Sequence, residues 1–191
     1  MLKTVLATIG LVSVLACEAA PSDVVNAFVE ATRTGDLATL ATVSVVGWPD
    51  QRVRASDILA WWITRITASE DQAFELDERQ QRLNAARDAR DARLLESGEG
   101  EDAELVRIQS RVERLRAEIE REREEARKSV ETWAPIDEFQ GGVETRRAEV
   151  IVRSPTGDYH YALTLKRYRL SRSAEASPFA SRWIVTAIEP L

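Results

Sequence analysis

The chain has 191 residues with 26 basic and 32 acidic side chains, which gives a formal net charge of −6. One cysteine and one histidine are too few for a disulfide framework or a zinc-type cluster, so neither a metal nor a cofactor is predicted. Nucleic acid is bound by basic surfaces that neutralise phosphates, and this acidic composition predicts no nucleic-acid partner.

The first residues have the pattern of an export signal. A positive start at Met1–Lys3 precedes an apolar or small stretch from Thr4 to Ala16. This stretch is shorter than the roughly 20 residues that span a bilayer. It ends in Val14-Leu15-Ala16-Cys17, which resembles the lipobox of bacterial lipoproteins. The resemblance implies that residues 1–16 are a signal peptide and that Cys17 is lipidated; the alternative is an ordinary signal cut near Ala19.

The lipobox resemblance also implies a cellular location and a lipid anchor. The protein is expected in the bacterial cell envelope, held to a membrane by the lipid on Cys17. Glu18 follows the cysteine where aspartate is the usual inner-membrane signal, so the periplasmic leaflet of the outer membrane is favoured over the inner membrane. Four residues from Glu18 to Pro21 reach at most about 14 Å, so the folded part is expected close to the membrane.

Two helices and an apolar run are predicted next. Ser22 is a suitable N-cap for a helix with an apolar stripe, and Gly35 is suited to end it. Asp36 then caps a second short helix. The apolar run Ile58–Ile66 is predicted to be helical.

A strongly charged segment follows, with 19 acidic and 13 basic residues among the 63 from Ser69 to Glu131. Its second half has apolar residues at the 3-4 spacing of a coiled coil, namely Leu105, Ile108, Val112, Leu115 and Ile119. Its first half is interrupted by Arg87 and Arg90, and Ser97–Glu101 contains the glycines of a turn. These features predict an antiparallel helical hairpin about 45 Å long.

The surface of this hairpin allows two interpretations. Most charges are those of a solvated helix surface. The apolar seam is expected to pair within the chain because the turn is short, while Arg87 and Arg90 leave room for an outside partner. The competing interpretation is that the seam pairs with a second protein chain.

After the charged segment, apolar residues recur at every second position, which predicts β-strands. Ala148–Arg153 and Tyr159–Leu165 form a hairpin around a five-residue turn at Ser154–Asp158. The apolar positions then shift to Tyr168 and Leu170, which predicts a β-bulge near Lys166–Arg167. Trp183–Ile188 is the last predicted strand.

The two ends of the chain resemble the cystatin-like roll of the nuclear transport factor two superfamily. The resemblance rests on Val24–Asp36, a phenylalanine-containing helix that ends in Gly-Asp, and on Ser181–Val185 of the last strand. It implies an α+β fold with a curved antiparallel sheet packed on N-terminal helices. The roll would comprise residues 17–67 and 134–191, interrupted by the hairpin insert at 68–133. A pocket is implied, lined by Trp61, Trp62, Tyr159, Tyr161 and Trp183; alternatively these aromatic residues fill the core.

No catalytic residues are predicted. His160 alternates with Tyr159 and Tyr161 and therefore lies on the opposite strand face, so no acid–base pair emerges. The favoured function is that of a non-enzymatic lipoprotein whose hairpin contacts an envelope partner through the seam and the two arginines. The alternatives are a small-ligand binding or isomerase-like roll, and self-association through the hairpin.

Overall fold

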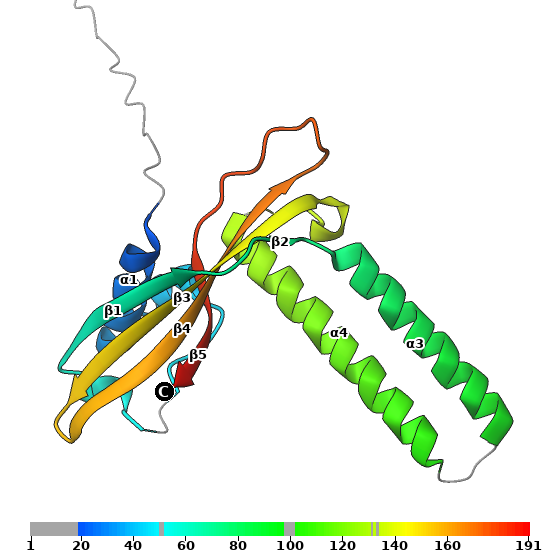
Figure 1. Cartoon of the computed structure of the whole chain (residues 1–191), viewed down its shortest axis with the longest axis horizontal. Coiled ribbons are helices and arrows are strands. Elements are labelled where there is room, and N and C mark those ends of the chain that lie inside the picture. The colour runs from blue at the N-terminus through cyan, green and yellow to red at the C-terminus, as the bar shows by residue number, and fades with distance from the viewer. Residues whose placement is uncertain (1–18, 50–51, 98–101, 131, 133) are drawn as a thin grey trace, which may run out of the picture.

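A computed structural model of the protein describes residues 19–49, 52–97, 102–130, 132 and 134–191. Within them it has four α-helices and a five-stranded antiparallel sheet (Figure 1). The helices are α1 (Pro21–Thr34), α2 (Leu37–Val43), α3 (Leu76–Ser97) and α4 (Ala103–Val130). The strands are β1 (Ala60–Ala68), β2 (Gln72–Ala73), β3 (Gln140–Ser154), β4 (Gly157–Ser171) and β5 (Ile184–Pro190). The predicted α+β class and the long helix pair are confirmed. None of the described helices has the length and apolar character needed to cross a membrane.

The N-cap of helix α1 lies two residues before its predicted position. Ala20 is the N-cap and Pro21 the first helical residue, a position where the missing proline N–H costs nothing. The carboxylate of Asp23 accepts a hydrogen bond from the Ala20 amide at 3.1 Å. The helix ends as predicted at Gly35, whose φ is 70°, and Asp36 caps α2. The prediction of Ser22 as the cap was therefore wrong, while the end of α1 and the start of α2 are confirmed.

The sheet is built on one long hairpin. The strand order is β1-β3-β4-β5, and β2 pairs with the same edge of β3 as β1. Strands β3 and β4 pair without a break from Gln140–Ser171 to Ser154–Gly157. The predicted hairpin is confirmed, but its turn has two residues, Pro155 and Thr156, rather than five.

The apolar run at Ile58–Ile66 is a strand and not the predicted helix. It forms most of β1, which pairs with β3 along Arg146–Arg153. A short continuous apolar run fits a strand as well as a helix, and pairing with β3 decides between them here. The pairing shifts register between Ile63 and Arg65, a local irregularity in this edge strand.

The two faces of the sheet bury two separate cores. Phe28 of α1 packs in the first, which we name the α1 core, with Leu163 and Leu165 of β4. Tyr168 and Leu170 of β4 belong to the second, the hairpin core, with apolar residues of α3 and α4. Because β3 and β4 stay in register throughout, the odd-numbered and even-numbered side chains of each strand point to opposite faces of the sheet.

The predicted bulge near Lys166–Arg167 is thus wrong. The apolar pattern shifts there because the covered face of the sheet changes from the α1 core to the hairpin core. The pairing of β4 with β5 does shift register between Thr164 and Leu165, because Thr186 of β5 has no partner residue in β4.

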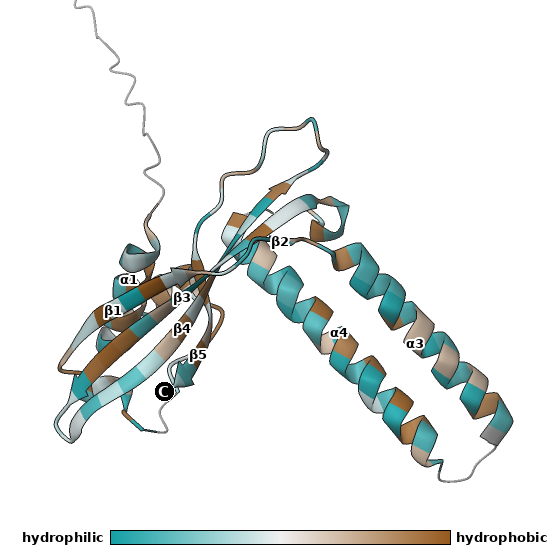
Figure 2. Ribbon diagram, in the orientation of Figure 1, coloured by the Kyte–Doolittle hydropathy of each residue, from teal (hydrophilic) through white to brown (hydrophobic). Residues whose placement is uncertain are grey.

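Helices α3 and α4 form an arm that leaves the sheet on the side away from α1 (Figure 1). With 28 residues, α4 is about 42 Å long. Both helices are mostly hydrophilic along their length (Figure 2). The arm is the most extended part of the described molecule, and how it is attached and what it exposes bear most directly on function.

Candidate functional site

The arm is fixed to the sheet by a buried carboxylate. The Glu125 side chain of α4 is 3% exposed, and its Oε2 accepts hydrogen bonds from Lys166 Nζ and Tyr168 Oη of β4, both at 2.7 Å. Burial, reinforced by the adjacent carboxylate, raises the pKa of the Tyr168 hydroxyl well above its ordinary value. Tyr168 therefore stays protonated and donates to Glu125, which holds α4 in one rotation against β4.

A second buried carboxylate joins the two helices. Glu122 occupies a position of the apolar seam, and its Oε2 lies 2.7 Å from Nη1 of Arg79 on α3. Burial is the largest influence on Glu122 and raises the pKa of its carboxyl group. Glu122 can occupy the apolar seam because Arg79 of α3 lies opposite it and compensates its charge.

Two further residues of α4 extend these attachments. Ser129 Oγ donates to the Arg182 carbonyl at 2.7 Å and accepts from the Tyr168 amide at 3.0 Å. Lys128 Nζ donates to the Ser44 carbonyl at 2.6 Å, at the end of α2. Helix α4 is thus bound to β4, to the segment before β5 and to α2. The base of the arm, defined as 76–86 and 112–130, is a rigid continuation of the sheet.

The distal half of the arm, defined as 87–96 and 102–111, is packed differently. Buried side chains end at Ala86 on α3 and Val112 on α4, and none of the described side chains beyond them is buried. Leu95 is 89% exposed, Val106 61% and Leu94 47%. Three of the seven large apolar residues that are exposed in the described chain therefore belong to the distal half of the arm.

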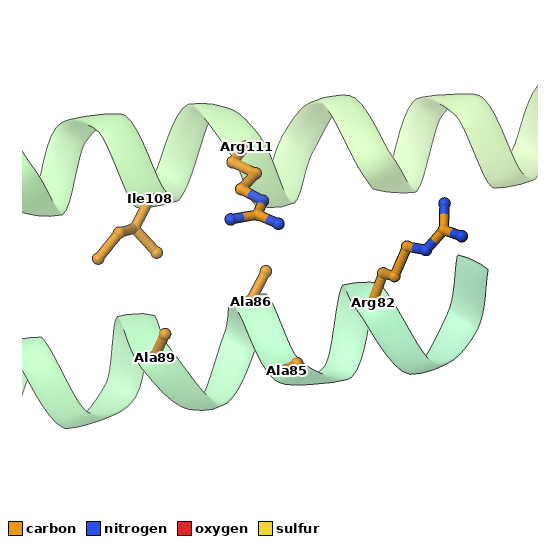
Figure 3. A pocket seen from close by; sticks show the side chains of 6 residues that line it. All are labelled: Arg82, Ala85, Ala86, Ala89, Ile108 and Arg111. Atoms are coloured by element: carbon orange, nitrogen blue, oxygen red, sulfur yellow. The ribbon is translucent and has the colours of Figure 1, made fainter. Parts of the chain in front are cut away.

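A cavity of about 210 Å³ lies between α3 and α4 where the base meets the distal half (Figure 3). It is lined by Arg82, Ala85, Ala86, Ala89, Ile108 and Arg111. The alanines of α3 are too short to fill the space opposite Ile108. We call this cavity the arm groove.

Two guanidinium groups border the arm groove. Arg82 projects from α3 and Arg111 from α4, each toward the space between the helices (Figure 3). Arg82 is 3.3 Å from Glu78 at an exposed position, where an ion pair contributes little. Among the described residues no carboxylate lies within 4.0 Å of the Arg111 guanidinium. The groove combines an apolar floor with positive charge at its rim.

The structure divides the predicted contact seam. Val112 and Ile119 are 7% and 1% exposed and pack inside the helix pair, and Leu115 is half-buried beside them. Leu105 and Ile108 are half-buried in the distal half, Ile108 in the groove. Arg87 and Arg90 are partly exposed, and Arg90 pairs with Asp91 at 2.7 Å. The sequence pattern missed Leu95, Val106 and Arg111, because none of the three belongs to the apolar seam.

The five aromatic residues proposed for a pocket do not all lie on one face. Trp61, Tyr159, Tyr161 and Trp183 belong to or pack against the α1 core. Tyr161 is 1% exposed, and its ring centroid is 4.8 Å from that of Trp48. Trp62 lies on the opposite face, 37% exposed, with the Arg153 guanidinium 5.2 Å from its ring centroid. Of the five, Trp183 borders a cavity, near the start of α1.

The remaining predicted features are the single histidine, the absence of a metal site and the lipidated cysteine. His160 is exposed on β4, opposite Ile151 of β3. Within the described residues no three His, Cys, Asp or Glu side chains are grouped to hold a metal ion. Cys17 and the lipobox lie outside the described residues.

Comparison of the chain with family models, curated proteins and solved structures gives no match.

Proposed function

We propose that this protein is a non-enzymatic lipoprotein of the bacterial cell envelope that contacts a partner protein through the distal half of its helical arm. The observation that carries the proposal is the contrast between the two parts of the arm. The base is bound to the sheet through Glu125, whereas an unfilled groove lies where the base meets the distal half, and Leu95 and Val106 of the distal half are exposed. A rigid base with an incompletely packed end is what a presented contact surface requires.

Physical chemistry favours a partner at this surface. Burial of exposed apolar surface against a partner is favourable by roughly 25 cal/mol per Å² of area removed from water. The arm groove accepts an apolar side chain on its floor at Ile108, and its rim at Arg82 and Arg111 favours acidic neighbours. The partner we propose is an amphipathic helix with acidic residues beside its apolar stripe.

The tether supports the same function. Lipidation of Cys17 would leave about 14 Å of chain before α1, which keeps the α1 side of the sheet at the membrane. Helix α4, about 42 Å long, leaves the sheet on the other side (Figure 1). The arm is therefore the part of the molecule able to reach a partner away from the membrane surface, and we place the anchor in the periplasmic leaflet of the outer membrane.

We also propose that α1 and the sheet form a cystatin-like roll into which the arm is inserted. The support is the helix–sheet packing of the α1 core and the position of both arm helices between β2 and β3. Tyr161 packs against Trp48, whose ring in turn packs against Phe28 of α1. We assign Trp61, Tyr159 and Tyr161 to this core and not to a ligand pocket.

Site-specific photocrosslinking in cells tests the contact. A photoreactive residue replaces Ala89 in the groove or, as a matched control, Ala117 on the exposed surface of the base. We expect an adduct from position 89 that Arg111→Glu abolishes and that Arg116→Glu, the same charge change outside the groove, leaves intact. No adduct at 89, or equal adducts at 89 and 117, would refute the proposal, and an adduct of two copies of the chain would replace it with self-association.

The anchor has its own test. Metabolic labelling with an alkyne fatty acid should mark the wild-type protein and not Cys17→Ser. Labelling that persists in Cys17→Ser, or its absence from the wild type, would contradict the lipoprotein assignment.

A further inference from the structure

A second cavity lies where the chain enters α1, on the side of the sheet away from the arm. Its volume is about 280 Å³, and it is lined by Ala19, Ala20, Pro21, Arg146, Arg167 and Trp183. These residues come from three separate parts of the chain: the start of α1, the β3–β4 hairpin and the residue before β5. The fold thus brings two arginines and a tryptophan to one concave site.

Trp183 orders both arginines. Its side chain is 4% exposed, and the guanidinium carbons of Arg146 and Arg167 lie 5.3 Å and 4.9 Å from its ring centroid. A guanidinium over an indole ring is attracted to the π face and loses freedom before any ligand binds. Its N–H groups lie in the guanidinium plane, so the edge of a stacked arginine still donates hydrogen bonds.

One buried carboxylate is shared by the arginines of this region. Glu144, 7% exposed, lies 2.8 Å from Arg167 Nη2 and 3.9 Å from Arg146 Nη2, and it also pairs with Arg169. Because the contact with Arg146 is the long one, Glu144 orients this guanidinium group without occupying its N–H donors.

Arg146 is the arginine with donors to spare. It has five N–H donors, and within the described residues it donates one hydrogen bond, from Nη1 to the Thr145 carbonyl at 3.0 Å. Its side chain is 26% exposed, against 9% for Arg167. The Ala20 amide already donates to Asp23, and the arginines are the positively charged donors in the cavity lining.

We propose that this cavity binds a phosphate-type anion. Arg146 donates to the phosphate oxygens, Arg167 supplies a second positive charge from the cavity wall, and Trp183 keeps both side chains oriented. Guanidinium groups match the geometry of phosphate oxygens and bind them through charge-assisted hydrogen bonds.

The position of the cavity suggests two sources for the anion. Ala19 is two residues from Cys17, so the cavity wall lies within about 7 Å of chain from the cysteine. If Cys17 carries a lipid, the headgroup phosphate of a neighbouring phospholipid is within reach, and this source rests on the proposed function. Free phosphate is the other source and does not depend on the anchor.

Calorimetric titration of the full chain in a non-ionic detergent tests the site, with chloride holding the ionic strength constant. The probes are inorganic phosphate and short-chain dihexanoyl-phosphatidylglycerol. We expect Arg146→Gln to weaken binding about tenfold, the equivalent of one lost interaction of about 1.4 kcal/mol. Arg169→Gln is the matched control, because it removes the same charge from the same Glu144 cluster outside the cavity lining. It should change affinity less than about threefold.

The pattern of binding identifies the source. Phosphate without the lipid indicates a free anion, and the lipid without phosphate indicates a headgroup; either supports the site, as does binding of both. Glu18→Gln removes the acidic residue next to the cavity in sequence, and it is titrated in parallel so that a competing carboxylate cannot hide the site. Absence of binding to both wild type and Glu18→Gln, or equal losses in Arg146→Gln and Arg169→Gln, overturns the proposal.

This test is separate from that of the anchor. Loss of labelling at Cys17 with phosphate binding intact would remove the proposed anchor and leave the anion site. The converse result would remove the site alone. Thermal melts of each variant identify a substitution that acts by unfolding, and Arg146→Lys, which keeps the charge, should bind more tightly than Arg146→Gln.

Discussion

Two isoleucines of α4 provide a direct measure of the difference between the base and the distal half of the arm. Ile119 lies in the base and is 1% exposed, while Ile108 lies in the distal half, half-buried beside the arm groove. The substitutions Ile119→Ala and Ile108→Ala delete the same atoms from the same helix, 11 residues apart. Any difference in their effect therefore reports packing and not helix propensity.

The expected costs follow from burial. Truncating a fully buried isoleucine to alanine typically lowers the free energy of unfolding by about 2–5 kcal/mol, part of which comes from the cavity left behind. We expect Ile119→Ala to lie in this range. Ile108 already borders a cavity of about 210 Å³ and is partly in water, so it has less burial to lose. For Ile108→Ala we expect a loss of about 1 kcal/mol or less.

Urea denaturation followed by circular dichroism and tryptophan fluorescence measures both values. Because Glu125 joins α4 to Lys166 and Tyr168, the helical and tryptophan signals should change together for Ile119→Ala. Equal losses from the two substitutions would refute the division of the arm into a packed base and an open distal half. A helical transition separate from the tryptophan transition in the wild type would contradict the rigid attachment.

The remaining predictions concern the sheet and its buried tyrosine. Gly141 has φ 152°, and a Cβ there would lie 2.0 Å from the Arg169 carbonyl oxygen, so Gly141→Ala should lower stability by well over about 1 kcal/mol in urea denaturation. Gly142→Ala, whose nearest contact would be 3.5 Å, should cost less; similar losses would contradict the close strand approach. The raised pKa of Tyr168 means that its protonated form stabilises the fold, a contribution fully present below the ordinary pKa of 10.0 and lost as pH rises above it. Melting temperatures between pH 8 and 11 should therefore fall less steeply for Tyr168→Phe than for the wild type, and parallel curves would refute this linkage.

Local sequence was sufficient for several elements because their signals act over a few residues. Gly35 ends α1 through a left-handed backbone conformation, and Asp36 caps the next helix. The glycine-containing turn predicted two antiparallel arms, and the α3–α4 pair confirms them. The alternation from Tyr159 predicted the β-hairpin. Each of these patterns has the same meaning in any fold, so no tertiary information was needed.

Tertiary structure decided the features in which distant segments compete. The run Ile58–Ile66 became a strand because β3 offers it a pairing edge. Near Lys166 the apolar residues of β4 change from odd-numbered to even-numbered positions because a second core lies on the other face of the sheet. In the sequence alone this change looks the same as a β-bulge. Glu122 and Glu125 are acceptable inside the arm because Arg79, Lys166 and Tyr168 lie opposite them.

The candidate sites divide in the same way. The apolar seam predicted which face of α4 is important, but burial by α3 determined that Val112 and Ile119 are internal and left the groove at Ile108 open. The cavity near α1 combines Arg146 and Trp183 from distant positions, and nothing in the sequence joins them. Sequence by itself determined the local elements and the charge of the arm, while the address signal stays a prediction. Only the fold decided which charges are buried and paired and which remain open to a partner, because pairing depends on neighbours that the chain brings together from far apart.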